Sequence, residues 1–348
     1  MIIFDGIIFD LQDAGGISRY FSELVRAAAS SGKLPFVFAT SKRGIERVPE
    51  DLRCYVHSYK ERMLERIRPF KFSPATTDSR MVFHSSYYRL HESPLAKNVV
   101  TIHDMIPELF GHSWSEKALA IQKRHAIKHA DHIITVSRST KLDLLKMLPE
   151  VERIPISVIH NGISPAFRYE RSIRREHRAV FVGSRRRYKD FAFSIELMRS
   201  LEQYHLDIIG GGALDDKETE LLNQACSARY HHHAYLTDEQ LNRLYNRAKI
   251  LIYPSRYEGF GLPPLESMKC GTPVIVSNRS SLPEIVGENG LMVNPDNVLE
   301  LKNLILKIIE NPDYRRKLKE YYMKQAEKFT WEKCIQKTIQ SYESILMK

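Results

Sequence analysis

Two carboxylates eight positions apart give this chain its clearest chemical signal. Glu258 and Glu266 open and close the segment EGFGLPPLE, which follows an apolar run over 249–254 that is typical of a buried strand. The paired prolines suit the first turn of a helix, whose unpaired amides favour an anion. The glycines let the backbone approach a ligand, and the carboxylates can accept hydrogen bonds from sugar hydroxyls. Two glutamates at this spacing also occur at solvated helix starts, but the surrounding residues favour a nucleotide-sugar site.

A cluster of cations follows another predicted strand. The apolar run 179–183 ends in a glycine, and Arg185, Arg186, Arg187 and Lys189 come soon after it. Such cations can neutralise a departing diphosphate. The three consecutive arginines leave open which of them would do so beside the lysine.

Two strand ends in the N-terminal half also carry polar or glycine residues. Gly15 and Gly16 precede a predicted helix, where amides can meet a phosphate, although a Gly-Gly pair alone is most often a turn. His103 and Asp104 follow the apolar run 99–102. A lone histidine is more often structural, and the aspartate suits a helix cap better than a catalytic base. The missing GxGxxG fingerprint disfavours a nicotinamide enzyme.

The EGFGLPPLE segment closely resembles the E-x7-E signature of retaining glycosyltransferases of family 4, which have the GT-B fold. The resemblance implies that Glu266 holds the nucleotide ribose and that Glu258 lies at the donor sugar. It also implies that His103 reaches hydroxyls of that sugar. Lys189 would meet the diphosphate together with Arg185, which fits the family spacing best, or with the next arginine.

Further elements resemble the family in the expected order over almost the whole chain. The loop 13–16 would meet the diphosphate and the acceptor, and the segments 207–212 and 235–241 would lie near the base. The candidate catalytic residues are therefore His103, Arg185, Lys189 and Glu258. The candidate nucleotide-sugar-binding residues are Gly15, Gly16, Gly183, Arg186, Gly211, Tyr235, Leu236, Gly259, Phe260, Gly261, Leu262 and Glu266.

Strands and helices alternate along the chain, which predicts an α/β protein with doubly wound domains. Expected strands are 2–9, 35–39, 81–84, 98–102, 132–136, the start of 155–167, 179–183, 206–209, 250–253 and 273–276. Expected helices are 17–31, 115–129 and most of the chain after 299.

A Gly/Pro-rich turn near 165 marks the expected domain boundary. We expect a Rossmann-like acceptor-binding domain over 1–165 and a Rossmann-like nucleotide-sugar domain over 166–328. The segment 329–348 resembles the family helix that packs back on the first domain. In the GT-B fold the two domains face a central cleft, and ligands bind beyond the carboxyl ends of the strands.

The composition is ordinary for a two-domain globular enzyme, with 348 residues of which 43% are hydrophobic and 27% charged. The apolar runs are strand-sized, and the start MIIFDGIIFDLQD lacks the basic region of a signal peptide. We therefore expect a cytoplasmic protein with reduced cysteines. The net charge of +10 raises nucleic acid as a partner, but the basic residues form no run interleaved with aromatics.

Two basic blocks account for much of this charge. The block 168–189 is interpreted over much of its length as a solvated linker. The block 60–71, KERMLERIRPFK, alternates cations with apolar residues and predicts an amphipathic surface helix. Such a helix would either lie weakly on an anionic membrane, at its inner face, or dock on its own domain.

No metal is expected. The D-x-D triplet of metal-dependent GT-A enzymes is missing, and the consecutive histidines 231–233 would point in different directions. We expect a metal-independent, retaining hexosyltransferase that uses a UDP- or GDP-linked glucose or mannose. Its acceptor would be an oligosaccharide or lipid-linked glycan of bacterial-type polysaccharide or lipopolysaccharide synthesis. The alternatives are a nucleotide-sugar epimerase of the same architecture and a catalytically silent sugar-nucleotide-binding protein.

Overall fold

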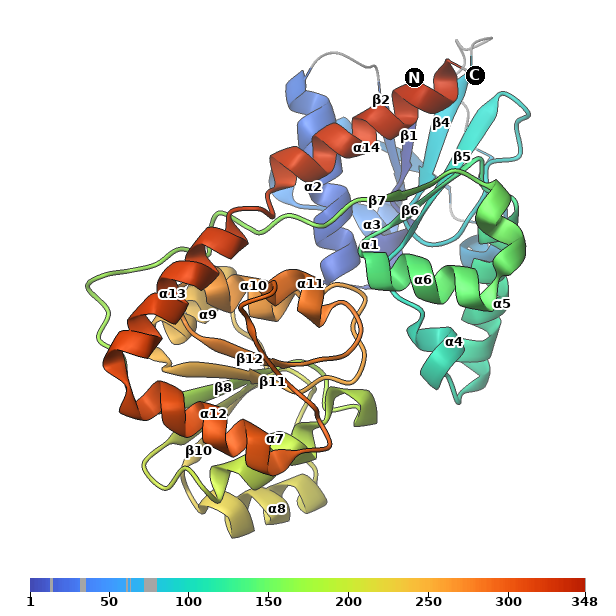
Figure 1. The fold of residues 1–348 in the computed structure, drawn as a ribbon. Helices are drawn as coiled ribbons and strands as arrows, with labels where there is room; N and C mark the ends of the chain where they lie inside the picture. The colour runs from blue at the N-terminus through green and yellow to red at the C-terminus, as the bar shows by residue number, and fades with distance from the viewer. Residues whose placement is uncertain (13–14, 32–35, 61, 63, 72–79, 348) are drawn as a thin grey trace. The chain divides into compact units, whose positions relative to one another are not determined.

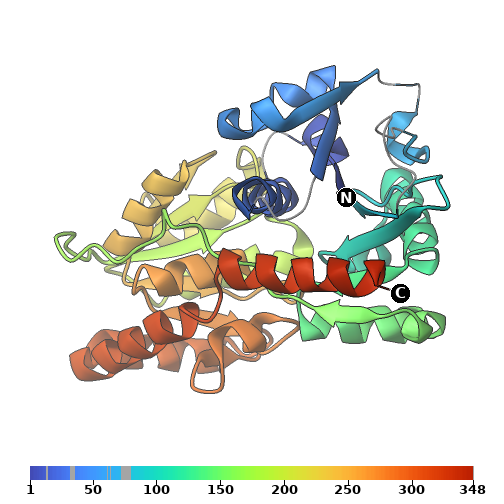
Figure 2. The same ribbon diagram turned by 90° about the horizontal axis from the view of Figure 1, so that it is seen from above.

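A computed structural model of the chain describes residues 1–12, 15–31, 36–60, 62, 64–71 and 80–347. The chain divides into two compact units. Unit 1 consists of Met1–Gly162 together with Trp331–Lys348, and unit 2 consists of Ile163–Thr330. In each unit, helices cover both faces of a parallel sheet (Figures 1 and 2).

The sheet of unit 1 has the strand order β3-β2-β1-β4-β5-β6-β7 within the described residues. Its strands are β1 (Ile2–Asp5), β2 (Phe36–Ser41), β3 (Val56–Tyr59), β4 (Met81–Ser85), β5 (Ala96–Ile102), β6 (His132–Thr135) and β7 (Ile156–Val158). Its helices are α1 (Ile7–Leu11), α2 (Gly16–Ser31), α3 (Lys42–Ile45), α4 (Ile106–Phe110), α5 (Trp114–Lys128), α6 (Arg138–Met147) and α14 (Trp331–Leu346). Most strands are buried on both faces, which explains why they read as apolar runs.

The sheet of unit 2 has the order β10-β9-β8-β11-β12-β13 within the described residues. Its strands are β8 (Arg178–Val182), β9 (His205–Ile209), β10 (Tyr230–His233), β11 (Ile250–Tyr253), β12 (Val274–Ser277) and β13 (Leu291–Val293). Its helices are α7 (Phe191–Met198), α8 (Asp216–Cys226), α9 (Asp238–Arg247), α10 (Leu262–Lys269), α11 (Leu282–Val286), α12 (Val298–Glu310) and α13 (Pro312–Ala326).

Both sheets share one topology. From a central first strand, β1 or β8, the chain adds two strands on one side and then crosses to add β4 or β11 on the other. This order is that of the Rossmann fold, in which ligands bind beyond the carboxyl ends of the strands where the order reverses. The prediction of two Rossmann-like doubly wound domains is confirmed.

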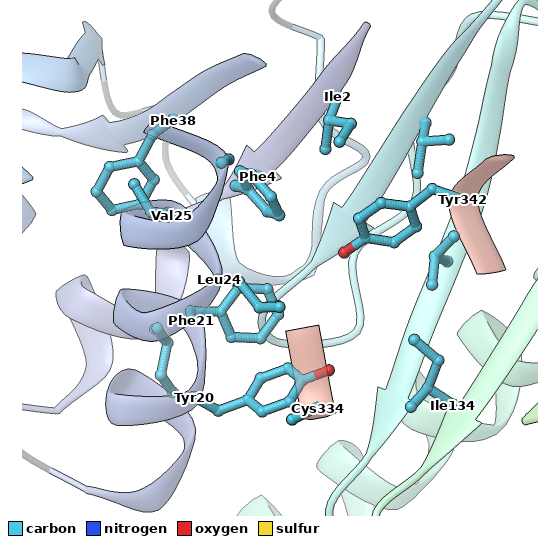
Figure 3. Close-up of a cluster of buried hydrophobic side chains, with 14 of the residues drawn as sticks. Ile2, Phe4, Tyr20, Phe21, Leu24, Val25, Phe38, Ile134, Cys334 and Tyr342 are labelled. Atoms are coloured by element: carbon cyan, nitrogen blue, oxygen red, sulfur yellow. The ribbon is translucent and has the colours of Figure 1, made fainter. Parts of the chain in front are cut away.

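The last helix, α14, belongs to the core of unit 1. Trp331, Cys334 and Tyr342 of this helix are buried in the cluster that also contains Phe4 and Tyr20 (Figure 3). Figure 2 shows α14 in red. The chain therefore leaves unit 1 after β7, builds unit 2 and returns, as the predicted C-terminal helix requires.

The first predicted strand is too long. β1 ends at Asp5, and the apolar residues beyond Gly6 form the short helix α1 instead. A carboxylate oxygen of Asp5 accepts from the amide of Ile7 at 3.0 Å, which favours a turn there. A short apolar run does not by itself distinguish a strand from a buried helix, because both bury all of its residues.

The prediction of an amphipathic helix over 60–71 is wrong for the described part of that block. Glu61 and Met63 lie outside the described residues. Only a single 3₁₀ turn, Glu65–Ile67, forms in the described part, and Phe70 bridges to the strand-like segment at His91. The residue before Pro69 is extended, as the proline ring demands. The buried Glu65 holds the turn in place through the guanidinium of Arg89 at 2.6 Å.

The basic block 168–189 is also more ordered than a solvated linker. Arg175 donates to four backbone carbonyls in unit 2, including that of Cys270 at 3.1 Å.

The strands β3, β10 and β13 have no counterpart among the predicted elements. Among the described residues no helix is long and apolar enough to cross a bilayer. The four cysteines are unpaired, and three of them are buried.

Candidate functional site

The candidate residues of unit 2 gather at the carboxyl edge of its sheet. Gly183 follows β8, Gly211 lies in the loop after β9, and Glu258 lies in the loop after β11. Gly183 has φ 140°, Gly211 has φ 83° and Gly261 has φ 113°, so all three adopt backbone conformations that other residues rarely take. The glycines thus turn the chain sharply at the edge where Rossmann folds bind ligands.

Lys189 and Glu258 form a buried ion pair at this edge. The ammonium of Lys189 donates to Glu258 Oε1 at 2.5 Å and to the hydroxyl of Tyr253 at 3.0 Å. The two charged side chains are only 12% and 10% exposed. Burial alone would lower the pKa of Lys189, but the interactions with Tyr253 and Glu258 outweigh it and raise that pKa. The lysine is therefore a firmly protonated cation where the sequence predicts the diphosphate.

Serines of the loop after β12 hold the backbone around Glu258. The amide of Glu258 donates to Ser280 Oγ at 3.1 Å. The hydroxyl of Ser281 donates to the carbonyls of Glu258 at 3.0 Å and of Phe260 at 2.7 Å. Sequence reasoning missed both serines, although a polar run directly after a buried strand at the same sheet edge was a usable signal.

We expect Ser281→Ala to lower kcat/KM for the donor about tenfold, because the carbonyl of Phe260 loses the Ser281 hydroxyl at a cost of about 1–3 kcal/mol, while the carbonyl of Glu258 keeps Ser280 as a donor. This loss destabilises the loop that carries Glu258. Steady-state kinetics and thermal unfolding check this result. The control is Thr338→Val, which removes a buried hydroxyl that donates to a carbonyl within α14 at 2.8 Å. An equal drop in kcat/KM for both variants would contradict a local effect on the loop.

Glu266 lies on the buried face of α10, whose first turn contains the two prolines as predicted. The helix starts after Gly261. Glu266 Oε2 accepts from the hydroxyl of Tyr245, on α9, at 3.3 Å. Burial, followed by the charge of Glu266, raises the pKa of Tyr245, so the tyrosine stays a donor. Tyr245 thus orients the carboxylate of Glu266, and the sequence around Glu266 gives no sign of this contact.

Arg185, which the sequence predicts to bind the diphosphate, instead contacts groups of the protein itself. Its guanidinium donates to the carbonyls of Gly210 at 2.7 Å and Ala213 at 2.6 Å, and it pairs with Glu218 at 2.8 Å. The side chain is only 5% exposed. Arg185 therefore shapes the loop after β9 in this structure. Arg186, the other candidate, is exposed.

The predicted base-binding element lies beyond β10. Tyr235 is 73% exposed, and Leu236 is half-buried. Thr237 caps α9 through a reciprocal pair of hydrogen bonds with Gln240. The cap fixes where the helix begins, and so it fixes the loop that presents Tyr235 and Leu236 at the sheet edge.

In unit 1, His103 directly follows β5. Its Nε2 atom is buried and has no hydrogen-bond partner among the described residues. Burial lowers the pKa of His103 to about 4, so the imidazole is neutral at pH 7. The ring of Tyr20 packs edge-on at 5.2 Å. A neutral ring with an unused nitrogen can donate to or accept from a sugar hydroxyl.

The residues around His103 fix its position. The buried Lys123 donates to the carbonyl of Asp104 at 2.5 Å and pairs with Glu108 at 2.9 Å. Asp104 Oδ1 accepts from the amide of Ile106 at 2.9 Å, but the N-cap position of α4 is Met105, so the aspartate orients the turn before the helix and does not cap it as predicted. Sequence reasoning missed Lys123, which reaches this loop from the middle of α5.

Gly15 and Gly16 lie exposed at the N-terminus of α2. The rest of that loop, Asp13 and Ala14, is outside the described residues. No group of three or more His, Cys, Asp or Glu side chains in the described ranges is placed to hold a metal ion.

Comparison with protein families agrees with this arrangement. Residues 14–167 match the model "Glycosyltransferase Family 4", and residues 167–325 match the model "Glycosyl transferases group 1". The chain belongs to glycosyltransferase family 4. The two matches together span residues 14–325, which include all of the predicted site residues.

Curated relatives of this chain include bacterial mannosyltransferases. O-antigen chain mannosyltransferase B of Escherichia coli is 35% identical over 172 residues, which are 47% of this chain and 45% of the relative. O-antigen chain mannosyltransferase RfbU of Salmonella typhimurium is 29% identical over 230 residues, which are 64% of each protein. The match therefore spans less than two thirds of each of these relatives.

Solved structures of similar fold cover the chain almost completely. Sucrose-phosphate synthase from Thermosynechococcus elongatus covers 99% of both chains with a TM-score of 0.77 and 21% identity. Anabaena Alr3699/HepE, solved in complex with UDP-glucose, covers 99% of both chains with a TM-score of 0.74 and 15% identity. These likenesses show the GT-B fold.

Proposed function

We propose that this family 4 protein is a retaining hexosyltransferase that moves mannose or glucose from a nucleotide diphosphate sugar to a glycan acceptor. The observation that carries the proposal is the buried pair of Lys189 and Glu258 at the carboxyl edge of unit 2, with Glu266 on the helix that follows. The names of the mannosyltransferase relatives support mannose and polysaccharide synthesis. The UDP-glucose complex of a structural neighbour supports a nucleotide-sugar donor.

Unit 2 supplies the groups for the donor. Glu266 would accept hydrogen bonds from the ribose hydroxyls, and Lys189 with Arg186 would meet the diphosphate. The amides at the start of α10 would add partial positive charge. Glu258 would accept hydrogen bonds from the donor sugar. In unit 1, the neutral His103 would bind another hydroxyl of that sugar.

The reaction that this arrangement suits is a front-face displacement. The bond between the anomeric carbon and the diphosphate oxygen breaks, and a bond to the acceptor oxygen forms on the same face. The acceptor proton passes to the departing diphosphate, so no enzyme nucleophile is required. Stabilising the charge on that diphosphate is then the main catalytic task, and Lys189 is the buried cation placed for it.

The decisive experiment is a donor screen with proton NMR of the product. We expect one UDP- or GDP-linked glucose or mannose to be consumed only when a glycan acceptor is present, with retention at the anomeric carbon. Donor converted to a second nucleotide sugar without acceptor would identify an epimerase. Binding without turnover of any donor would identify a silent binding protein, and an inverted product would overturn the retaining mechanism.

The proposed reaction is metal-independent. We expect that EDTA leaves at least half of the turnover, because the protonated Lys189 already supplies a cation that a divalent ion would otherwise provide. The assay is turnover after EDTA treatment and after readdition of Mg²⁺ or Mn²⁺. Complete loss with EDTA and recovery with either ion would contradict this prediction.

We further propose a cytoplasmic protein that associates weakly with the anionic inner face of a membrane through the block 64–71. The predicted helix is absent there, but Leu64 and Ile67 remain 60% and 59% exposed beside Arg66 and Arg68. Exposed apolar side chains next to cations favour an anionic bilayer surface, at about 1 kcal/mol per basic residue.

Co-sedimentation with phosphatidylglycerol vesicles tests this association. We expect salt-sensitive binding that the double variant Arg66→Glu/Arg68→Glu weakens about tenfold. Each basic residue contributes about 1 kcal/mol to membrane binding, and salt screening reduces this contribution. Arg62 is left unchanged because it pairs with the buried Glu65 at 2.8 Å. Arg66 lies over the ring of Tyr87 at 5.0 Å, so thermal unfolding of the double variant is measured alongside binding. Arg316→Glu/Lys317→Glu makes the same charge change on α13 and is the control. Equal binding to neutral vesicles, or equal loss in the control, would contradict the proposal.

A further inference from the structure

A cavity of about 560 Å³ lies in unit 2, between the helix α9 and the strands β8, β9 and β10. We call it the α9 cavity. Its lining includes Arg178, Asp207, His231, His233, Arg243 and Arg247. Lys189, Glu258 and Glu266 are not among its lining residues, and of the donor-site candidates in the described chain only Leu236 is. The volume is in the range of small-molecule sites.

Two walls of the cavity present basic groups to each other. Arg243 and Arg247 are four residues apart on α9, so they share one face of the helix. His231 and His233 are two residues apart on β10, so they share one face of the sheet, and their ring centres are 4.4 Å apart. This is an unusual polar lining for the space between a helix and a sheet.

The acidic groups near the cavity are already engaged. Asp207 pairs with Arg178 at 2.9 Å and with the ring of His233 at 3.0 Å. Arg247 pairs with Glu176 at 2.9 Å. Arg243 has no ion-pair or hydrogen-bond partner in the described part of the chain.

Cations four residues apart on a helix repel each other, although Glu176 offsets much of the charge of Arg247 here. An anion in the cavity would relieve this repulsion and give Arg243 a partner. The apolar side chains of Leu236 and Leu244 also line the cavity, so it offers contact for an organic group beside the cations.

We propose that the α9 cavity binds a small organic phosphate, with Arg243 as the main partner of the phosphoryl group and Arg247, which also pairs with Glu176, beside it. Arginine presents paired donors that match phosphate oxygens, and each such contact is a strong, charge-assisted hydrogen bond. The strands that wall the cavity lead directly to the loops after β8, β9 and β10, which are the predicted donor loops. An occupant therefore alters donor affinity, and this second part rests on the proposed function.

Isothermal titration calorimetry of the full chain tests the binding. The probes are inorganic phosphate and glucose 6-phosphate, which separate a bare phosphate site from an organic phosphate site. We expect glucose 6-phosphate to bind more tightly than phosphate. Arg243→Gln should weaken its binding about tenfold or more, the loss of one charge-assisted hydrogen bond. Arg243 is exposed, and the variant removes no ion pair or hydrogen bond among the described residues, so it is expected to fold normally.

Two controls locate the site. The double variant Lys189→Met/Glu258→Gln removes both charges of the donor site, so that neither is left unpaired, and should leave glucose 6-phosphate binding unchanged. Arg316→Gln removes an exposed arginine on α13 and should also leave it unchanged. Unchanged affinity in Arg243→Gln, or loss in Lys189→Met/Glu258→Gln, would overturn the α9 cavity as the site. Equal affinity for phosphate and glucose 6-phosphate would overturn the organic ligand.

Tungstate locates the anion site independently, because its anomalous scattering marks the position of a phosphate-like anion in a crystal. We expect a peak beside Arg243 and Arg247, and a peak only at the donor loops would overturn the proposal. For the regulatory part, saturating glucose 6-phosphate should change donor affinity about fivefold, the lower end of ordinary coupling energies. That change should vanish in Arg243→Gln. No change in the wild type would overturn regulation while leaving the binding result intact.

Discussion

Replacing Lys189 by methionine is expected to lower kcat about 10²- to 10³-fold, with a smaller rise in the KM for the donor. The range is that for removing one preorganised donor to a developing negative charge. Charge accumulates on the diphosphate as the glycosidic bond breaks, so a cation placed there acts more strongly on the transition state than on the bound donor. Steady-state kinetics with the donor that gives turnover provide both constants.

The same substitution also leaves Glu258 buried without its cation. Breaking a buried ion pair by removing one partner costs about 3–5 kcal/mol of stability, so thermal unfolding must be measured alongside activity. The double variant Lys189→Met/Glu258→Gln separates the two effects, because it removes both charges together. We expect the double variant to recover much of the stability and none of the lost turnover. A double variant that recovers turnover, or a single variant in which only KM moves, would contradict the assigned role.

The fold was predictable where the residue types of a short segment determine whether it forms a strand or a helix. The run over 250–253 is β11 to the residue, because β-branched and aromatic residues between polar turns suit a buried strand. The edge strand β10 was not predictable in the same way. Its histidines are partly exposed, and the sheet pairs their backbone with β9 regardless of side-chain polarity. Its position at the edge is set by sheet topology, which a local sequence pattern does not encode.

The block 60–71 shows how a long-range contact overrides a local pattern. The alternation of cations and apolar residues suits a helix, but Glu65 is buried against Arg89, which also pairs with Asp5. Two carboxylates and one guanidinium, all buried, need each other because an unpaired charge there would be costly. These partners are 24 and 84 residues from the arginine, so no window around Glu65 contains them.

In the candidate site, the sequence indicated the charged groups better than their partners. Motif spacing was enough to choose Lys189, Glu258 and Glu266. Spacing could not show that the first two pair with each other, or that Tyr253 and Tyr245 orient them. These contacts join residues from different strands and helices, and only the sheet order brings them together.

Glu266→Ala is expected to weaken binding of the nucleoside diphosphate by roughly 2–3 kcal/mol, the range for hydrogen bonds to a charged group. This corresponds to about a 30- to 150-fold rise in Kd. Calorimetry with the diphosphate of the preferred donor measures it, and the 2′-deoxy form of the same nucleotide is the matched ligand. The wild type should bind the deoxy form less tightly, and the variant should bind both forms alike, because the carboxylate that distinguishes them is gone. Tyr245→Phe is the companion variant, since it removes only the 3.3 Å hydrogen bond that orients Glu266, and it should have a smaller effect in the same direction. If Glu266→Ala still prefers the ribose form by the wild-type factor, the ribose hydroxyls have other partners and the carboxylate serves to anchor α9 to α10.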